Sequence, residues 1–243
     1  MINPMELTGK HILITGGSSG IGRAAAVQAS RLGAKVTIIA RNEERLQETI
    51  SMMDNAELHK YYVMDLNEVE KIEGLIKQIV TERGAIDGFC HAAGIGSVRP
   101  IRLSNFNYMQ SMFRIHIFAY SEFVRVLSKK GNLKEGASIV GISSYAADNG
   151  AVGQAAYASA KSAMNGLLST CAKELVDRKI RINNVAYAVV ETAMYHDFLE
   201  YGEKIIQKMG IIDVESAANT IMFLFCDSSR YITGTVIEVY AGI

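Results

Sequence analysis

Three side chains in the second half of the chain have the types and spacing of an acid-base site: Ser144, Tyr157 and Lys161. If a helix covers Tyr157, Lys161 lies about one turn later on the same face, where its ammonium group can approach the phenol ring. A free tyrosine has a pKa of about 10, and a neighbouring positive charge lowers that pKa by favouring the phenolate. We therefore expect Tyr157 to exchange protons with a carbonyl or alcohol oxygen that Ser144 holds in place. The same Tyr-x-x-x-Lys spacing is also common on solvated helix faces.

The composition is that of a globular protein with balanced charge. Of the 243 residues, 49% are apolar, which suffices for a sizeable core in one domain. The 25 basic and 25 acidic residues cancel without a long run of either sign, so nothing favours nucleic acid as a partner. Residues 1–10 lack a cationic segment followed by an apolar one, and no apolar run approaches the roughly 18 residues that span a bilayer. We expect a cytoplasmic protein that does not enter the membrane.

The three cysteines, Cys90, Cys171 and Cys226, are far apart and lie in apolar segments. Such positions favour buried thiols over disulfides or metal ligands. We therefore expect no metal site.

A glycine-rich loop near the start of the chain has the composition of a phosphate-binding turn. It follows an apolar run at residues 11–15 and precedes a helical pattern at residues 21–32. The backbone N–H groups at such a helix start favour a pyrophosphate, although a glycine-rich turn can also be a generic loop. Its spacing is G-x-x-x-G-x-G rather than the commoner G-x-G-x-x-G. The loop consists of Gly16, Gly17, Ser18, Ser19, Gly20, Ile21 and Gly22.

A second predicted strand, residues 35–40, ends at Ala40, Arg41 and Asn42. If the glycine loop holds the phosphates of a dinucleotide, this end lies beside the adenosine ribose. An acidic residue there is typical of NAD sites, whereas a guanidinium suits a 2′-phosphate. Arg41 therefore predicts NADP(H), unless it only begins a solvated helix over residues 43–52.

The remaining chain alternates buried strands with helices. This order predicts an α/β fold, a doubly wound parallel sheet of Rossmann type with helices on both faces, in a single domain over residues 1–243. Ligands of such sheets bind at the carboxyl ends of the strands. Further strands are expected at residues 61–64, 86–91, 137–142, 180–186 and 235–240, and further helices at residues 69–81, 108–127 and 157–177. Gly16, Arg41, Asp65, Ala92, Ser144 and Val190 all fall at or just after predicted strand ends.

The chain resembles the short-chain dehydrogenases/reductases over almost its whole length, in the single-domain branch that includes the 3-oxoacyl-acyl-carrier-protein reductases. The resemblance implies a cofactor motif at residues 15–22, a sheet-stabilising motif at Ala92-Ala93-Gly94, and the catalytic roles of Ser144, Tyr157 and Lys161. It also implies that Asp65-Leu66 borders the adenine, and that Val190 and Thr192 contact the nicotinamide end. Residues 231–234 resemble the family near the carboxyl terminus as well.

The chain departs from the family pattern at three places. His116 stands where the family has a catalytic asparagine that helps to hold a water, so the histidine either preserves that relay or weakens it. His91 replaces the first asparagine of the sheet motif. Tyr187-Ala188 replaces a Pro-Gly pair, which adds bulk beside the nicotinamide. For both histidines, the simpler interpretation is a hydrogen-bonded, partly buried side chain.

The mechanism that the resemblance implies is hydride transfer from NADPH to a carbonyl carbon, with Tyr157 as the proton donor, Ser144 orienting the carbonyl and Lys161 lowering the pKa of Tyr157. A substrate lid is expected at residues 187–210. Its apolar side chains favour an apolar small molecule or an acyl thioester, unless they serve only packing. They are Met194, Tyr195, Phe198, Leu199 and Tyr201.

An acyl carrier protein would require a basic patch near the mouth of the crevice. Lys129, Lys130, Lys134 and Arg178 are candidates, although scattered cations are also the ordinary surface of a protein. The resemblance further implies a homodimer or homotetramer.

Two alternatives remain on the same fold. One is a non-catalytic NADP-binding sensor or partner subunit, suggested by His116, His91 and Tyr187-Ala188. The other is a sugar-nucleotide epimerase or dehydratase, for whose usual substrate domain 243 residues leave little room. Neither alternative is removed by sequence alone, because many activities share such a fold.

Overall fold

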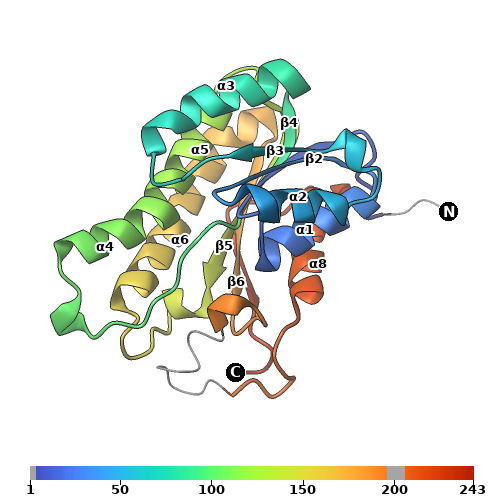
Figure 1. Cartoon of the computed structure of the whole chain (residues 1–243). Coiled ribbons are helices and arrows are strands. Elements are labelled where there is room, and N and C mark those ends of the chain that lie inside the picture. Colours follow the sequence, from blue (N-terminus) through green and yellow to red (C-terminus); the bar gives the residue numbers. More distant parts are fainter. Residues whose placement is uncertain (1–3, 196–205) are drawn as a thin grey trace.

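The computed structural model describes residues 4–195 and 206–243, which fold around one seven-stranded sheet (Figure 1). All neighbouring strands run parallel, in the order β3-β2-β1-β4-β5-β6-β7. The strands are β1 (His11–Thr15), β2 (Lys35–Ala40), β3 (Lys60–Val63), β4 (Ile86–His91), β5 (Leu133–Ser144), β6 (Arg181–Tyr187) and β7 (Val236–Val239). The doubly wound parallel sheet predicted from the sequence is confirmed.

Helices cover both faces of the sheet (Figure 1). They are α1 (Gly20–Arg31), α2 (Glu43–Ser51), α3 (Ile72–Arg83), α4 (Phe106–Phe113), α5 (Ala119–Leu127), α6 (Ala155–Leu175) and α8 (Val214–Phe225). A π-helical segment, η4 (Arg114–Phe118), joins α4 to α5. Within the described ranges, none of these helices combines the length and apolar character that a membrane span requires.

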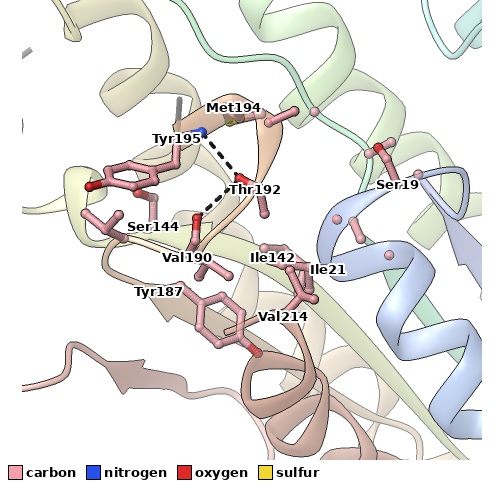
Figure 2. A pocket seen from close by; sticks show the side chains of 18 of the residues that line it. Ser19, Ile21, Ile142, Ser144, Tyr187, Val190, Thr192, Met194, Tyr195 and Val214 are labelled. Carbon is pink, nitrogen blue, oxygen red and sulfur yellow. Dashed lines mark hydrogen bonds between the residues drawn. The ribbon is translucent and has the colours of Figure 1, made fainter. Parts of the chain in front are cut away.

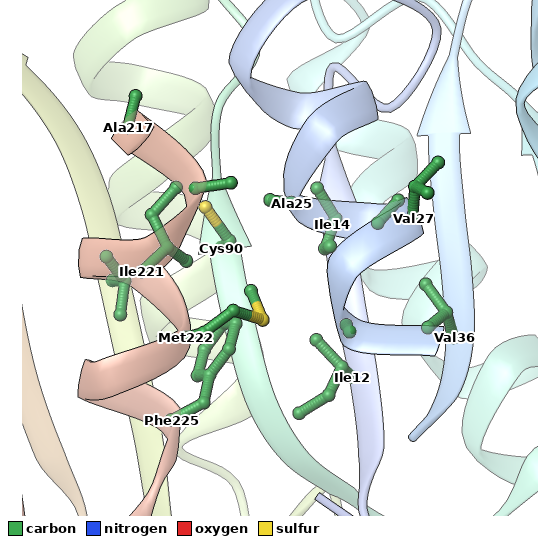
Figure 3. Close-up of a cluster of buried hydrophobic side chains, with 14 of the residues drawn as sticks. Ile12, Ile14, Ala25, Val27, Val36, Cys90, Ala217, Ile221, Met222 and Phe225 are labelled. Atoms are coloured by element: carbon green, nitrogen blue, oxygen red, sulfur yellow. The ribbon is translucent and has the colours of Figure 1, made fainter. Parts of the chain in front are cut away.

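The alternation of side chains along each strand divides the core into two layers. Ile12 and Ile14 of β1 point to the face that α1 and α8 cover, where Figure 3 shows them with Cys90 and Phe225. Leu13, between them, joins the layer under α3, α5 and α6. Every residue of β1 is buried, as a central parallel strand requires.

Two helical features differ from the prediction. The helix expected over residues 108–127 is interrupted by η4. The sequence did not predict this interruption, because one π-helical turn is too short to change the periodicity of the apolar residues. The helix α8, absent from the prediction, packs on α1 through small and apolar residues such as Ala217 and Ile221. The prediction of buried thiols is confirmed for Cys90 and Cys226, whereas Cys171 is a half-buried thiol.

The four histidines of the described ranges, His11, His59, His91 and His116, are buried within the fold. His11 illustrates how they are held: its ring nitrogens lie 3.1 Å from the carbonyl of Gly84 and 2.8 Å from Thr37 Oγ1. Burial lowers its pKa to about 4, and burial also lowers the pKa of His59. These side chains are therefore neutral in the folded protein near neutral pH.

Acidification is expected to destabilise the protein. Above pH 6.5 both states hold neutral imidazoles, whereas between pH 6.5 and about 4 the unfolded chain binds a proton on residue 11 that the folded chain excludes. The free energy of unfolding should then fall by up to about 1.4 kcal/mol per pH unit from His11 alone. Urea unfolding at several pH values measures this slope.

His11→Asn is the comparison variant, because asparagine does not titrate. It should be less stable than the wild type near neutral pH, since the hydrogen bonds of the ring are lost. The difference between the two proteins should shrink as the pH falls below 6.5. A difference that is independent of pH would contradict the assignment.

Candidate active site

A cavity of about 910 Å³ lies at the carboxyl ends of the strands, where the predicted site residues converge. The residues predicted from the sequence that line it are Gly16, Ser18, Ser19, Gly20, Ile21, Gly22, Arg41, Leu66, Ala92, Gly94, His116, Ser144, Tyr157, Lys161, Val190 and Thr192. Figure 2 shows Ser19 and Ile21 on one side of this space and Val190 and Thr192 on another. Segments that are far apart in sequence thus form one cavity.

Asp65 and His91, also predicted as site residues, are not among the residues that line the cavity. Asp65 Oδ1 accepts hydrogen bonds from the backbone and side-chain nitrogens of Asn67, at 2.9 and 3.0 Å. These bonds shape the turn after β3 that carries Leu66 to the cavity. Asp65 therefore does not line the cavity itself and contributes only to the conformation of the turn that places Leu66 there.

The glycine loop is folded so tightly that a side chain does not fit at Gly16 or Gly22. A Cβ on Gly22 would lie 2.3 Å from the carbonyl oxygen of Gly16, and a Cβ on Gly16 would lie 2.7 Å from the backbone nitrogen of Ala93. Gly16 also has a φ of +72°, which favours glycine. The loop is thereby held against the end of β4.

The start of α1 is open toward the cavity. Ser19 is the N-cap residue, yet its side chain makes no capping hydrogen bond. The N–H groups of the first turn therefore remain available to an anion. Arg23 fixes the loop from outside, because its guanidinium donates to the Ser18 carbonyl and to Glu48, each at 2.7 Å.

The end of β2 places two guanidinium groups at the cavity, of which the sequence predicted one. Arg41 and Arg45 both line the cavity and are exposed. Asn42 caps α2 by accepting a hydrogen bond from the Arg45 backbone at 2.8 Å. The signal for Arg45 was present in the sequence, because a residue in the first turn of the helix that Asn42 caps must lie beside Arg41.

Ser144, Tyr157 and Lys161 meet where β5 ends and α6 begins. Lys161 is 4% exposed, and its Nζ lies 5.6 Å from the centroid of the Tyr157 ring. That Nζ donates to the carbonyl of Ile142 at 2.6 Å. Burial lowers the pKa of Lys161 to about 7. The spacing of four residues in α6 therefore places the Lys161 amine beside the Tyr157 ring, as predicted.

The expected lowering of the Tyr157 pKa is wrong for this structure. Burial raises that pKa, and the hydrogen bond with Ser144 opposes the change without cancelling it. The physical reason is that the prediction counted the attraction of a cation and left out desolvation, which penalises the phenolate more strongly. Tyr157 is a neutral phenol near neutral pH.

His116 lies in η4 with its ring edge-on to the ring of Tyr157, at a centroid distance of 5.4 Å and an interplanar angle of 85°. Its Nε2 lies 2.8 Å from the carbonyl oxygen of Ile95, whereas its buried Nδ1 has no hydrogen-bond partner. Burial first, and then the charge of Lys161, lower its pKa well below 6.5. The imidazole is thus neutral and fixes the segment after β4.

His91 is a packed core histidine. Its Nδ1 lies 3.0 Å from Thr15 Oγ1, and its Nε2 lies 3.1 Å from the carbonyl oxygen of Ile115. The ring also stacks on Tyr120. These contacts tie β1, β4 and η4 together behind the cavity.

Tyr187 lines the cavity, but its side chain does not project into it, contrary to the expectation from the sequence. Its ring points toward α8, as Figure 2 shows, and its hydroxyl donates to the carbonyl of Ala217 at 2.5 Å. The side chain is almost fully buried. Most of its volume therefore belongs to the core between β6 and α8.

Gly22→Ala should destabilise the protein and distort the loop, because the added methyl group meets backbone that cannot move away. Overpacking of this kind costs about 1–3 kcal/mol. Gly166→Ala is the matched control, since a Cβ at this position in α6 would meet nothing within 4 Å. It should leave stability unchanged or raise it by up to about 1 kcal/mol. Urea unfolding of both variants distinguishes the two positions, and equal effects would contradict the packing argument.

Comparison with known proteins agrees with this architecture. A family model described as short chain dehydrogenase matches residues 10–201. Carbonyl reductase family member 4 of Xenopus laevis is 30% identical over 95% of this chain and 96% of its own length. The 3-oxoacyl-[acyl-carrier-protein] reductase FabG of Rickettsia prowazekii is 32% identical over 98% of both chains.

Solved structures show the same likeness. A dehydrogenase/reductase from Sinorhizobium meliloti aligns with a TM-score of 0.89 and 25% identity, over 98% of this chain and 96% of that one. Carveol dehydrogenase from Mycobacterium avium, solved in complex with NAD, aligns with a TM-score of 0.87 and 25% identity over 98% of both chains. The chain therefore belongs to the short chain dehydrogenase family.

Proposed function

We propose that the protein is an NADPH-dependent oxidoreductase that reduces a carbonyl to an alcohol, with Tyr157 as general acid. The observation that carries the proposal is that Ser144, Tyr157 and Lys161 line the same cavity as the glycine loop and Arg41. The names of the relatives, a carbonyl reductase and a 3-oxoacyl reductase, support the same reaction type.

The residues present fit a dinucleotide cofactor. The uncapped start of α1 and the tightly folded glycine loop suit a pyrophosphate, and the exposed Arg41 and Arg45 suit a 2′-phosphate. At the other end, Thr192 Oγ1 donates to the Val190 carbonyl at 3.3 Å, which braces the segment proposed to hold the nicotinamide (Figure 2). When bound, NADPH supplies a hydride.

The side chains of this protein would handle the proton. Tyr157 is held as a neutral phenol, which is the form that can protonate a carbonyl oxygen as negative charge develops on it. Ser144 would donate a hydrogen bond to the same oxygen. Lys161, with a pKa of about 7, would stabilise the phenolate that remains and return a proton to it. These protonation states favour the reducing direction near neutral pH.

The described part of the substrate end is mainly apolar. Val152, Met194, Ile206 and Ile211 line it. We propose an uncharged apolar carbonyl substrate, of which a 3-oxoacyl thioester is one example, and we propose that residues 187–210 select it. Phe198, Leu199 and Tyr201, expected to contribute, lie outside the described residues.

The four cations considered for docking an acyl carrier protein do not lie at the cavity mouth. They flank the start of β5 and the end of α6, whereas the cavity lies at the carboxyl end of β5. Lys134 pairs with Asp87 at 2.8 Å, and Arg178 donates to the carbonyls of Ser128 and Leu133. Of the two interpretations that the sequence left open, these contacts therefore favour ordinary surface charges over a docking patch.

A non-catalytic NADP-binding protein is the second candidate, favoured by His116 beside Tyr157. A wild-type protein that binds NADPH and oxidises it with no ketone of a broad panel would support it.

We also propose that the protein is cytoplasmic and forms a homodimer or homotetramer. The exposed apolar side chains of Ile101, Leu103 and Phe106 support association between subunits. Light scattering during size-exclusion chromatography measures that state.

Tyr157→Phe should reduce turnover by about 10²- to 10⁴-fold, because the proton donor is lost while the ring is kept. The dissociation constant for NADPH, measured by fluorescence titration, should stay within about twofold. Tyr231→Phe, at an exposed position, is the control and should behave as the wild type. Retained turnover in Tyr157→Phe would remove Tyr157 from the proposed mechanism.

Arg41→Asp should shift the ratio of NADPH to NADH affinity by about 10- to 100-fold toward NADH, the range expected for losing a charge-assisted hydrogen bond. Lys77→Asp makes the same change of charge on exposed α3, away from the cavity, and should leave the ratio unchanged. If the two variants shift the ratio equally, the effect is one of net charge and Arg41 is not a phosphate ligand.

A further inference from the structure

The ring of Tyr240, just after β7, supports the catalytic end of β5. It meets the ring of Tyr145 edge-on, at a centroid distance of 5.0 Å and an interplanar angle of 88°. Tyr145 directly follows Ser144 and lines the cavity, whereas Tyr240 does not line it. Tyr240 therefore lies behind a wall of the cavity, and edge-to-face packing fixes the position of that wall.

The hydroxyl of Tyr240 plays no part in this contact. It is buried and has no hydrogen-bond partner. A buried hydroxyl without a partner destabilises the folded state, so the ring alone accounts for the structural role of the side chain. Replacing Tyr240 by phenylalanine therefore keeps the ring contact with Tyr145, whereas replacing it by alanine removes that contact.

The two residues after Tyr240 adopt left-handed backbone conformations. Ala241 has a φ of +50° and Gly242 a φ of +82°. For alanine this conformation costs about 1–2 kcal/mol, so it persists only where surrounding contacts hold it. The Ala241 carbonyl accepts a hydrogen bond from the Met209 N–H at 3.0 Å, and a Cβ on Gly242 would lie 3.3 Å from the Cβ of Lys208. The turn is thus pressed against residues 208 and 209.

Residues 206–211 form another wall of the same cavity. Ile206, Gln207, Gly210 and Ile211 line it. Gln207 Oε1 accepts a hydrogen bond from the Val189 N–H at 2.8 Å, which ties this wall to the segment after β6. The turn at residues 240–242 therefore contacts both walls, one through a ring and one through backbone.

We infer that the turn at residues 240–242 is a strut that sets the separation of the two walls at the substrate end, and that Tyr240 is a positioning residue for substrate selection. It acts through Tyr145, from a position outside the cavity. The inference rests on the proposed carbonyl reduction only where it is tested by KM values, because the binding measurement below requires no turnover. It predicts that loosening the strut widens the substrate end and leaves the cofactor end intact.

The experiment compares Tyr240→Ala with Tyr240→Phe on a homologous series of methyl ketones and NADPH. In Tyr240→Ala, KM for the smallest ketones should rise about fivefold, within the range of a lost aromatic pair, while KM for the bulkiest ketones stays level or falls. Tyr240→Phe should keep the wild-type order of ketones and melt at a higher temperature, because an unpartnered hydroxyl is removed. Tyr231→Ala, which removes an exposed ring from the same part of the chain, is the control.

A binding measurement separates this inference from the proposed reaction. Saturation-transfer NMR on the protein with NADP⁺, which cannot reduce a ketone, ranks the same ketones by affinity without turnover. A changed ranking in Tyr240→Ala, restored in Tyr240→Phe, supports the strut even if the wild type reduces none of them. A uniform loss of ketone and cofactor binding, or an unchanged ranking, overturns it, because a purely structural role lowers the amount of folded protein and not the ratio between ketones.

Discussion

The burial of the Lys161 ammonium group is the constraint on which the electrostatics of the site depend. A charged amine away from water is stable only with hydrogen-bond acceptors, and Lys161 Nζ donates to the Ile142 carbonyl at 2.6 Å. Its pKa falls to about 7. The same charge adds to burial in lowering the pKa values of His91 and His116. Near neutral pH, the group that gains or loses a proton is therefore Lys161, and the imidazoles of His91 and His116 stay neutral.

The sheet explains why a buried cation and an open anion-binding turn can share one cavity. The chain winds from β1 outward to β3 and then returns to place β4 on the other side of β1. Crossovers on either side of this reversal leave a crevice at the carboxyl ends of β1 and β4. The glycine loop enters it from β1, and the missing Cβ atoms of Gly16 and Gly22 let the backbone pack directly on Ala92 and Ala93.

Much of the fold and the local parts of the site could be predicted from the sequence, because they rest on short-range patterns. Buried strands, the glycine loop and the helical pair Tyr157 and Lys161 each follow from spacing alone. The π-helical segment, the contacts of His116 and the raised pKa of Tyr157 could not, since they depend on burial among segments far apart in the chain. The same is true of Tyr145 and Tyr240, which are 5.0 Å apart at their ring centroids without any pattern that links them.

The two ends of the cavity differ in the physics that governs them. At the end of β2, the exposed Arg41 and Arg45 line the cavity within one short stretch, so the proposed preference for NADP(H) rests on local sequence. At the substrate end, the walls come from the segment after β5 and from the connection between β6 and α8. A ring contact to Tyr240 and hydrogen bonds made by Met209 and Gln207 hold them from behind. Apolar walls select by shape, and shape depends on how such segments are spaced. The proposed substrate selection therefore depends on the assembled fold, including residues such as Tyr240 that lie behind the walls.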